Sequence, residues 1–321
     1  MRRVCVVGGA GFIGSHVVDR LLADETTERV TVYDNFSSGR AWHLAHHGND
    51  SRLEVVRGDV IDLDTLTDTV AGVDTIVHLA SNPDIARAAT EPAIDFDQGT
   101  RLTHHVVEAA RRAETQLVLY ASGSGVYGDV GYLEVDEDHG PLLPISTYGA
   151  SKLAGEALIA SYCFMFGLTA CAFRFGNVVG PRQTHGVGFD FVRRLLEDPD
   201  HLVILGDGKQ SKSYVHVSDI VDAVFVAARQ APRPFAVFNV ATEDYLTVTE
   251  IAEMAARIVQ TKHTNFDYTG GDRGWRGDVP VVRLNSQRIR QLGWSNQFTC
   301  REALERSMQS LLQEATDRTS P

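Results

Sequence analysis

The stretch "VVGGAGFIGSHVV", residues Val6 to Val18, decides the fold class, because a short apolar run passes through a glycine-rich turn into a helical pattern. Its glycines Gly8, Gly11 and Gly14 follow a G-x-x-G-x-x-G spacing. The first would permit a tight turn, the second a close approach of backbone to a pyrophosphate, and the third close packing of the helix. A helix N-terminus at this point favours bound negative charge. The stretch predicts a dinucleotide-binding strand-turn-helix unit.

Short β-branched runs alternate with longer amphipathic stretches on either side of this turn and beyond it. Repeated βα units predict a parallel sheet with helices on both faces, and strands covered on both faces are apolar almost throughout. We therefore predict an α/β fold, a Rossmann-type doubly wound parallel sheet with a smaller C-terminal mixed α/β substrate lobe. The expected strands are RVCVV (3–7), RVTVY (29–33), LEVVRG (53–58), DTIVHLA (74–80), TQLVLYAS (115–122) and LTACAFRF (168–175), and the expected helices lie near 12–23, 62–71, 93–112 and 146–167.

The regular alternation weakens after about residue 178. Segments 178–188, 205–213 and 269–280 are rich in Gly, Pro and charge, which is typical of loops. Helices expected near 187–197, 217–230, 247–260 and 300–316 separate them. This part of the chain is expected to form the lobe over the carboxyl edge of the sheet, where ligands of such sheets bind.

Composition favours a small-molecule ligand in a reducing compartment. The net charge of −12 disfavours nucleic acid or an anionic membrane surface as a partner. The four cysteines, Cys5, Cys163, Cys171 and Cys300, have no CxxC or CxxH spacing, so neither a metal site nor a disulfide framework is indicated. No apolar run reaches the roughly 18 residues of a membrane span, and the N-terminus reads as part of the fold. We expect a cytoplasmic protein with no metal.

An acidic residue at the end of the second expected strand indicates which dinucleotide binds. Asp34 stands there, about 20 residues beyond the glycine turn, where a carboxylate accepts hydrogen bonds from ribose hydroxyls. The same carboxylate would repel a 2′-phosphate, so NAD is favoured over NADP; Arg40 nearby is the residue that argues the other way. The tripeptide "GDV" follows the third expected strand, so Asp59 is predicted to bond the adenine amino group and Val60 to contact the ring.

A tyrosine and a lysine at positions i and i+4 carry the expected chemistry. Tyr148 and Lys152 in "TYGASKLAGEAL" share one face of a predicted helix. A free tyrosine, with a pKa near 10, is a poor base at neutral pH. A lysine ammonium together with a positive nicotinamide ring would stabilise the phenolate. Tyr148 is then predicted to remove a proton from a sugar hydroxyl while hydride leaves the same carbon.

Motifs along nearly the whole chain resemble one family. They are "GGAGFIGSH", "DNFSSGR", "GDV", "HLAS", "VYGD", "YGASK", "RFGNVVGP", "LGDGKQSKSYVHVSD" and "WRGDV". They resemble the extended short-chain dehydrogenases/reductases, specifically NAD-dependent nucleotide-sugar epimerases and dehydratases of the UDP-glucose 4-epimerase type. The resemblance implies an NAD cofactor, a UDP-sugar substrate and a homodimer through the helices near 93–112 and 146–167. It implies an NAD-binding domain over 1–177, with parts of 210–245 returning to it, and a mainly UDP-sugar-binding lobe over 178–321.

The family's roles carry over where its motifs match this chain. The catalytic candidates are Tyr148, Lys152, Ser122 and Ser124. The expected cofactor contacts are Gly8, Gly11, Phe12, Ile13, Gly14, Asp34, Asn35, Ser37, Asp59, Val60, Leu79, Ala80, Ser81, Gln98, Tyr148 and Lys152. The expected substrate contacts are Ser124, Tyr148, Asn177, Lys212, Asp278 and one of Arg273 or Arg276, where cations would meet the diphosphate and a carboxylate the ribose.

The chain departs from the family's pattern at the positions that separate one reaction from another. Epimerases usually carry a proton-relay hydroxyl where Gly123 stands, and 4,6-dehydratases carry an acid and a base where Ser124 and Gly125 stand. The usual asparagine before the helix near 100 is Gln98. The pair Tyr148/Lys152 still supports oxidation at C4, and the residues that would act at C5 and O6 are unassigned. Ser122, Ser124 and Tyr127 are the nearby candidates.

Three outcomes are open once a 4-ketone has formed. Hydride returns to the other face of C4 in 4-epimerisation, to C6 after elimination in a 4,6-dehydratase, or to C4 after elimination, which leaves a 5,6-alkene. The whole chain also resembles UDP-N-acetylglucosamine (UDP-GlcNAc) 5,6-dehydratases of the tunicamycin biosynthetic type, which implies a lyase in antibiotic biosynthesis. This reading is preferred, and the alternatives are a UDP-hexose or UDP-N-acetylhexosamine 4-epimerase, a catalytically weak NAD-binding protein and a net dehydrogenase.

Overall fold

The computed structural model describes residues 1–82 and 84–319. Its larger lobe is built on a seven-stranded sheet with the order β12-β7-β5-β4-β1-β2-β3, in which every neighbouring pair is parallel. The strand order reverses beside β1, so a crevice opens there at the carboxyl ends of the strands. The strands are β1 (Arg3–Val7), β2 (Arg29–Asp34), β3 (Leu53–Arg57), β4 (Thr75–His78), β5 (Leu117–Gly123), β7 (Thr169–Phe175) and β12 (Phe235–Val240).

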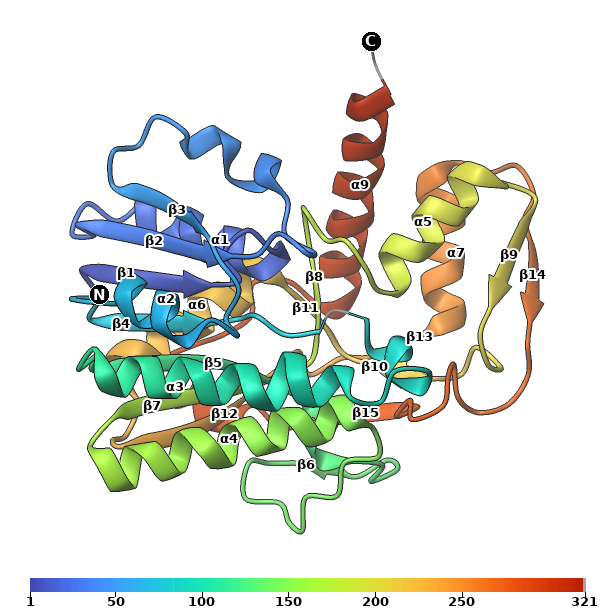
Figure 1. The fold of residues 1–321 in the computed structure, drawn as a ribbon. Coiled ribbons are helices and arrows are strands. Elements are labelled where there is room, and N and C mark those ends of the chain that lie inside the picture. Colours follow the sequence, from blue (N-terminus) through green and yellow to red (C-terminus); the bar gives the residue numbers. More distant parts are fainter. Residues whose placement is uncertain (83, 320–321) are drawn as a thin grey trace.

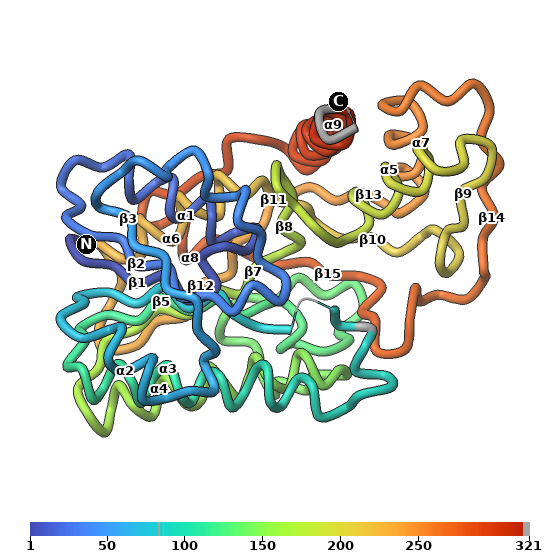
Figure 2. The backbone as a smooth tube through the Cα atoms, turned by 45° about the horizontal axis from the view of Figure 1, so that its top comes forward, coloured from blue at the N-terminus to red at the C-terminus, as the bar shows by residue number. Residues whose placement is uncertain are grey.

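Helices cover both faces of this sheet (Figures 1 and 2). Alternate side chains of β1 enter different cores: Val4 and Val6 join the cluster shared with α1 and α6, whereas Cys5 and Val7 join the one shared with α2, α3 and α4. This is why the strand is apolar at successive positions. The covering helices are α1 (Phe12–Leu22), α6 (Val217–Gln230), α2 (Leu63–Thr69), α3 (Leu102–Arg112) and α4 (Thr147–Phe166).

A smaller lobe packs beside the carboxyl edge of the sheet around its own core, which includes Phe191, Met254 and Leu304 (Figure 2). Its helices are α5 (Val187–Glu197), α7 (Val248–Val259) and α9 (Cys300–Thr319). The short strands at and beyond this edge are β6 (Glu134–Val135), β8 (Asn177–Val179), β9 (His201–Ile204), β10 (Ser211–Lys212), β11 (Tyr214–His216), β13 (Leu246–Thr247), β14 (Asn265–Tyr268) and β15 (Val281–Leu284). The remaining short helices are η1 (Ala41–His47), η2 (Ile85–Ala89), the π-helical η3 (Phe96–Arg101), η4 (Ser124–Tyr127) and α8 (Gln287–Arg290).

The predicted α/β class with a doubly wound parallel sheet is confirmed, and each of the quoted runs contains a strand. The strand prediction omitted β12, although its sequence FAVFNV is apolar at every position except Asn239. It also missed β8 and β10, which lie in segments expected to be loops and are too short to show a period. The expected helix near 93–112 begins as the π-helical segment η3 before it becomes α3.

Among the helices of the described residues, none combines the length and the apolar character that a bilayer span requires. The cysteines Cys5, Cys163, Cys171 and Cys300 are buried with free thiols.

Candidate functional site

A cavity of about 670 Å³ lies at the carboxyl ends of the sheet strands and reaches the smaller lobe. Arg273, Arg276 and Tyr127 are the predicted residues that stand outside its wall. The predicted residues that line it are Gly8, Gly11, Phe12, Ile13, Gly14, Asp34, Asn35, Ser37, Asp59, Val60, Leu79, Ala80, Ser81, Gln98, Ser122, Ser124, Tyr148, Lys152, Asn177, Lys212 and Asp278.

The glycine loop is shaped by close backbone contacts. Gly8 has a φ of 83°, and a Cβ at this residue would lie 2.8 Å from the backbone nitrogen of Ala80. A Cβ on Gly14 would lie 2.7 Å from the Cα of Gly9, so the helix packs directly on the loop. Gly11 caps α1 without any side chain, which leaves the first N–H groups of the helix open to the cavity. The loop therefore fits the pyrophosphate of a dinucleotide.

Substitution of Gly14 tests this packing. In Gly14→Ala the new methyl group would overlap the Gly8 carbonyl, so the loop or α1 must move. Overpacking of this kind costs about 1–3 kcal/mol of unfolding free energy. We expect denaturant unfolding of the cofactor-free protein to show this loss, and the purified variant to retain less NAD. Gly131→Ala is the control for a glycine-to-alanine change without steric overlap, because a Cβ there meets nothing within 4 Å. The φ of 63° at this residue still adds some local strain.

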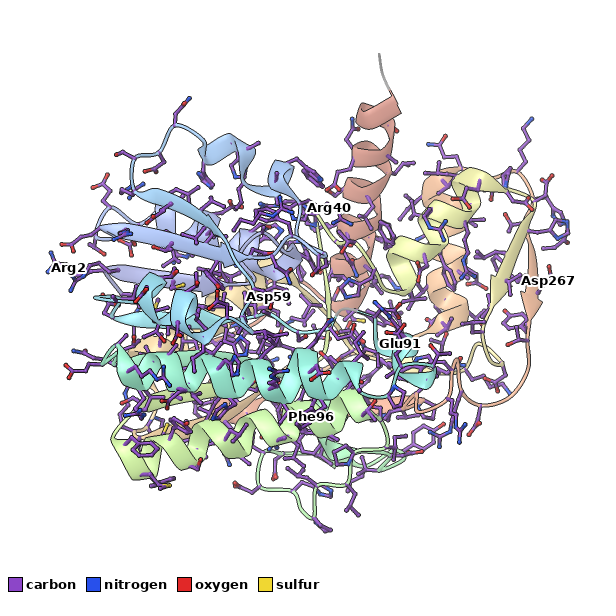
Figure 3. The ribbon with its side chains drawn as sticks, viewed as in Figure 1. Arg2, Arg40, Asp59, Glu91, Phe96 and Asp267 are labelled. Atoms are coloured by element: carbon purple, nitrogen blue, oxygen red, sulfur yellow. The ribbon has the colours of Figure 1, made fainter. Side chains whose placement is uncertain are left out.

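Asp34 is held in the orientation that ribose binding requires. Its carboxylate accepts hydrogen bonds from the backbone N–H groups of Ala10 (2.9 Å) and Phe36 (2.8 Å). Burial raises the pKa of Asp34, and these two donors act in the opposite direction. Arg40 and Asp59 are labelled in Figure 3; Asp59 lines the cavity, whereas Arg40 is exposed and donates to the Gly39 carbonyl (3.1 Å).

Tyr148 and Lys152 lie together in the cavity near the start of α4. The Ser146 hydroxyl accepts a hydrogen bond from the Gly149 N–H and so caps the helix at this point. The Lys152 ammonium lies 5.4 Å from the centre of the Tyr148 ring and donates to the Ala121 carbonyl oxygen at 2.8 Å. This hydrogen bond to β5 fixes the ammonium over the face of the phenol ring.

Burial shifts both groups of the pair toward their neutral forms. It raises the pKa of Tyr148 to about 12, against a hydrogen bond from Ser81 that lowers it. It lowers the pKa of Lys152 to about 8, against the negative charge of Asp95 that raises it. The ammonium by itself therefore does not lower the pKa of Tyr148 to a value at which the phenol can act as a base near neutral pH. The positive nicotinamide ring, the second charge that the sequence prediction invoked, has to complete the stabilisation.

Asp95 is a buried carboxylate beside the pair that the sequence prediction missed. It accepts hydrogen bonds from the Thr147 hydroxyl (2.7 Å) and the Asn82 side-chain amide (2.9 Å). Its charge raises the pKa of both Tyr148 and Lys152, so it supports the ammonium and opposes the phenolate. Asp95 lies far from both residues in sequence, and no local motif marks it.

Ser122 and Tyr127, two of the residues proposed for C5 and O6, belong to a buried network. The Ser122 hydroxyl donates to Glu156 at 2.5 Å. Arg174 donates to the same carboxylate at 3.0 and 2.7 Å and to the Tyr127 hydroxyl at 2.9 Å. The Tyr127 hydroxyl itself donates toward the Asn239 side-chain oxygen at 2.7 Å. Both hydroxyls are therefore engaged in this network near the end of β5, and the roles of Ser122 and Tyr127 at C5 and O6 stay predictions.

Removal of the cation from this network is expected to destabilise the fold strongly. The side chains of Arg174 and Glu156 are 4% and 6% exposed. Arg174→Met leaves a buried carboxylate without its partner, which costs about 3–5 kcal/mol of unfolding free energy. Denaturant unfolding measures this loss. The double variant Arg174→Met/Glu156→Leu is the comparison, and it should recover part of the loss, because no charge is then left unpaired. Equal stabilities of the single variant and wild type would contradict the argument.

The last residue of β5 has open space beside it, where a relay side chain would stand. Gly123 has extended backbone angles (φ −165°, ψ 162°), which any residue adopts. A Cβ built on it would have Tyr148 Cε1 as its neighbour, at 4.0 Å. Ser124 and Gly125 follow in the cavity wall, and Gln98 reaches the wall from the π-helical segment η3. π-helical turns are frequent at functional sites.

The residues expected to bind UDP are only partly brought together. Lys212 and Asp278 form an ion pair of 2.6 Å in the cavity wall, and the Asn177 amide donates to the Ser213 carbonyl at 3.2 Å. Arg273 is instead paired with Asp129 (2.5 Å) and donates to the Asp278 carbonyl (2.6 Å). Arg273 thus braces the loop from outside the cavity.

The loop between β8 and α5 contributes cavity residues that the sequence prediction missed. His185, Asp190 and Arg194 line the cavity from this loop and from α5, and Trp275 lines it from the loop before β15. The side chain of His185 remains partly accessible to solvent. The protein packed around it removes water from the imidazole, and this desolvation lowers its pKa. The available signal was a histidine in a Gly-Pro-rich segment directly after a strand, since such loops carry ligands.

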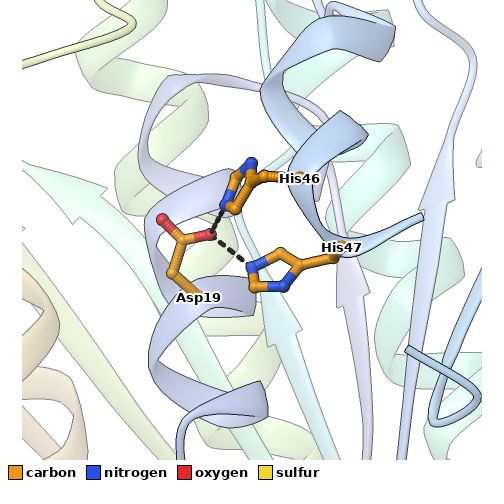
Figure 4. A group of neighbouring side chains, drawn as sticks. All are labelled: Asp19, His46 and His47. Carbon is orange, nitrogen blue, oxygen red and sulfur yellow. Dashed lines mark hydrogen bonds and ion pairs between the residues drawn. The ribbon is translucent and has the colours of Figure 1, made fainter. Parts of the chain in front are cut away.

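One group of metal-ligating side chains lies away from the cavity. Asp19 on α1 accepts hydrogen bonds from His46 (2.9 Å) and His47 (2.8 Å) of η1 on one carboxylate oxygen (Figure 4). Arg182 is paired with the other oxygen, and its guanidinium also reaches His16. Burial acts to raise the pKa of Asp19, but the hydrogen bond and charge of Arg182 prevail and lower it. Because a guanidinium already neutralises the carboxylate, the cluster is an ion-pair network that ties η1 to α1.

Comparison with known proteins agrees with this geometry. A family model described as the NAD dependent epimerase/dehydratase family matches residues 4–241. A UDP-glucose 4-epimerase of Mycolicibacterium smegmatis is 35% identical over 315 residues, covering 96% of this chain and 97% of its own. A putative UDP-glucose 4-epimerase of Methanocaldococcus jannaschii is 30% identical over 313 residues, covering 94% and 96%.

Solved structures are similar over almost the full chain. A crystal structure of a dTDP-glucose 4,6-dehydratase from Streptomyces venezuelae with NAD bound has a TM-score of 0.90 and 27% identity, covering 99% of this chain and 98% of its own. Epimerases and dehydratases are thus both among the similar proteins. The overall fold therefore does not distinguish the two reactions. The residues around Tyr148 must determine which of them occurs.

Proposed function

The chain belongs to the NAD-dependent epimerase/dehydratase family, and from this premise we propose that it converts UDP-GlcNAc to its 5,6-alkene with loss of water. It is an enzyme and its cofactor is NAD, which when bound accepts a hydride from a sugar carbon and returns it. The proposed roles divide the chain as the family does, with residues 1–177 and parts of 210–245 binding NAD and most of 178–321 binding the UDP-sugar.

The first proposed step is removal of the C4 hydroxyl proton by Tyr148. Its phenolate is the base, and the fixed ammonium of Lys152 supports the negative charge. The C4 carbonyl that results makes H5 acidic. Loss of H5 as a proton and of the 6-hydroxyl, together one water, gives the exocyclic double bond. Return of hydride and proton to C4 and O4 leaves no net oxidation.

The absence of a side chain at Gly123 is the observation that favours elimination over epimerisation in this proposal. In a 4-epimerase the sugar presents O4 in two positions, one before and one after the ketone turns over. A mobile hydroxyl near Tyr148 can serve both positions. In the elimination O4 loses and regains its proton in one place, so Tyr148 is sufficient without a relay. Gly123 leaves that relay space open.

The residues acting at C5 and O6 belong to the same proposal. With Ser122 and Tyr127 occupied in the buried network, Ser124 is the hydroxyl of the predicted set that remains in the cavity wall. We place Ser124 at the C5–C6 side of the sugar. Lys212, Asp278 and Asn177 are proposed to meet the UDP moiety from the smaller lobe.

A 4-epimerase is the second candidate, favoured by the 35% identity to the Mycolicibacterium smegmatis enzyme. The deciding experiment incubates the purified protein with UDP-GlcNAc in D₂O and follows the products by proton NMR. Vinyl protons support the elimination. UDP-GalNAc as the sole product would refute it and support the epimerase. Turnover of none of a panel of UDP-sugars would favour a binding protein, and sustained NADH release a net dehydrogenase.

A homodimer through α3 and α4 is part of the proposal. The two helices pack side by side on one face of the molecule (Figure 1). Large apolar side chains are exposed at the end of α4 and in η3, which directly precedes α3: Phe164 (74% exposed), Met165 (72%), Phe166 (50%) and Phe96 (61%). Light scattering should give a mass of two chains, and Phe164→Glu/Met165→Glu should lower it toward one. A monomeric wild type would refute the dimer. The role in antibiotic biosynthesis stays a prediction.

A further inference from the structure

A strap of residues 269–280 runs from β14, at the far side of the smaller lobe, back to β15 (Figures 1 and 2). Its first residues are attached to the smaller lobe, because the Gly270 N–H donates to the Gly206 carbonyl at 3.0 Å. Its second half lines the cavity, with Trp275 and Asp278 among the lining residues. The strap is therefore part of the wall on the side where UDP is proposed to bind.

Arg273 attaches the middle of the strap to the larger lobe. Its guanidinium pairs at 2.5 Å with the carboxylate of Asp129, which follows η4. That carboxylate is held for the contact, because its other oxygen accepts a hydrogen bond from the Gly131 N–H at 3.1 Å. The two paired side chains are 35% and 27% exposed, so water screens the pair only in part. Among the described residues, this is the one ion pair that joins the strap to the larger lobe.

The same guanidinium closes the turn that presents Asp278 to the cavity. It donates to the Asp278 carbonyl oxygen at 2.6 Å. Inside the turn, the Asp278 N–H donates to the Trp275 carbonyl and the Gly274 N–H donates to the Asp278 carboxylate, each at 3.1 Å. The other carboxylate oxygen accepts a hydrogen bond from the Lys212 ammonium at 2.6 Å. The positions of Asp278 and Lys212 in the wall thus depend on a turn that Arg273 joins to the larger lobe.

The strap touches the larger lobe a second time, just before the start of α4. A Cβ built on Gly277 would lie 3.2 Å from the Ile145 carbonyl oxygen and 3.5 Å from the Ser146 Cβ. No hydrogen bond accompanies this contact among the residues that the structure describes, so the strap is held there by packing. The ion pair of Arg273 with Asp129 is therefore the directed attachment between the strap and the larger lobe.

We propose that Arg273 and Asp129 clasp the two lobes together across the UDP side of the cavity, so that Arg273 positions Asp278 and Lys212 for the nucleotide. This inference rests on the proposed function, in which Asp278 and Lys212 meet the UDP moiety. Arg273 stands outside the cavity wall and acts through the turn, so it is a positioning residue. Its loss should weaken nucleotide binding and leave the chemistry at Tyr148 intact.

Arg273→Met is expected to raise the dissociation constant of the NAD-loaded protein for UDP by about 3- to 10-fold, because a partly exposed ion pair contributes less than a buried one. Calorimetric titration with UDP measures this change. In turnover, the KM for UDP-GlcNAc should rise by the same factor. The kcat should change little, because the Lys152 ammonium keeps its hydrogen bond to Ala121 beside Tyr148.

Asp129→Asn distinguishes a clasp from direct binding of Arg273 to the diphosphate. The asparagine keeps an oxygen for the Gly131 N–H but removes the charge that holds Arg273. A clasp predicts the same loss of UDP affinity as in Arg273→Met. It also predicts no further loss in the double variant, because each single change removes the same interaction. An Asp129→Asn variant that binds UDP as tightly as wild type, or more tightly, would overturn the clasp, since the released guanidinium would then serve the diphosphate directly.

Arg257→Met is the matched control for the loss of an arginine ion pair. Arg257 of α7 pairs with Glu305 of α9 at 2.8 Å, but both helices belong to the smaller lobe, so this pair does not cross between the lobes. The variant should keep the UDP affinity and the KM of wild type. An equal loss of affinity in Arg257→Met and Arg273→Met would indicate a general loosening of the smaller lobe and would contradict the clasp.

Hydrogen–deuterium exchange of the strap tests the clasp without any nucleotide. Peptides that cover residues 269–280 should exchange about 3- to 10-fold faster in Arg273→Met and in Asp129→Asn than in wild type. If the strap responds in this way but the wild type binds neither UDP nor a UDP-sugar, the proposed function alone is refuted. If the wild type binds UDP and the two variants change neither exchange nor affinity, the clasp alone is refuted.

Discussion

Tyr148→Phe is expected to abolish most turnover while NAD and UDP-GlcNAc still bind. The substitution removes only the phenol oxygen, so the ring keeps its packing beneath Lys152. Loss of a positioned general base costs about 10²- to 10⁴-fold in rate. We therefore expect kcat to fall by at least that factor with little change in the dissociation constants. Single-turnover kinetics and calorimetric titration of the NAD-loaded protein measure the two quantities.

The pH dependence of wild type should identify the same group. Burial raises the pKa of Tyr148 to about 12, and a bound nicotinamide cation would lower it by favouring the phenolate. Activity should therefore rise with pH through the pKa that Tyr148 has in the loaded enzyme. Burial lowers the pKa of Lys152 to about 8, so kcat/KM should fall again as the ammonium loses its proton. The residual activity of Tyr148→Phe should lack the acid limb.

A matched control comes from the neighbouring strand. Tyr120→Phe also removes a buried phenol oxygen close to Lys152, but Tyr120 stands outside the cavity wall that holds Tyr148. Its activity should stay near that of wild type. A Tyr148→Phe variant that works at full speed, or a Tyr120→Phe variant that is equally damaged, would remove the phenolate of Tyr148 from the mechanism.

The parts of the site that follow directly from a strand or a helix turn could be predicted from the sequence. Asp34 and Asp59 stand at strand ends, and the carboxyl ends of parallel strands meet at one edge of a sheet. Tyr148 and Lys152 share a helix face because they are four residues apart. In each case a local repeat sets the direction of the side chain, so the residue type and its spacing were sufficient to bring it to the cavity.

The parts that depend on a partner distant in sequence could not be predicted. Ser122 appeared free to act on substrate, but its hydroxyl donates to Glu156, 34 residues away. Arg273 appeared to be a diphosphate ligand, but it pairs with Asp129, 144 residues away. Asp95 approaches Tyr148 only through the packing of the segment before η3 on α4. Local periodicity says nothing about such contacts, because each one depends on how two separate segments pack.

Gly123→Ser is expected to change the product rather than abolish activity. The extended backbone accepts a side chain, and the new Cβ would meet Tyr148 at an ordinary contact distance of 4.0 Å. The added hydroxyl can carry a proton between Tyr148 and O4 in either position of the turning ketone. Since a positioned proton donor contributes about 10²- to 10⁴-fold to a step that needs it, the ratio of 4-epimer to 5,6-alkene should rise by at least about 10-fold. Proton NMR of the products in D₂O measures the ratio.

Gly123→Ala separates the hydroxyl from the volume it occupies. It places the same Cβ beside Tyr148 but supplies no proton, so its product ratio should remain that of wild type. If serine and alanine shift the ratio equally, the empty space at position 123, and not the missing relay, controls the reaction. If Gly123→Ser leaves the ratio unchanged while it moves the acid limb of the pH profile, the hydroxyl reaches Tyr148 without reaching O4. The choice between the two products would then lie with the residues that face C5 and O6, of which Ser124 is the first to replace.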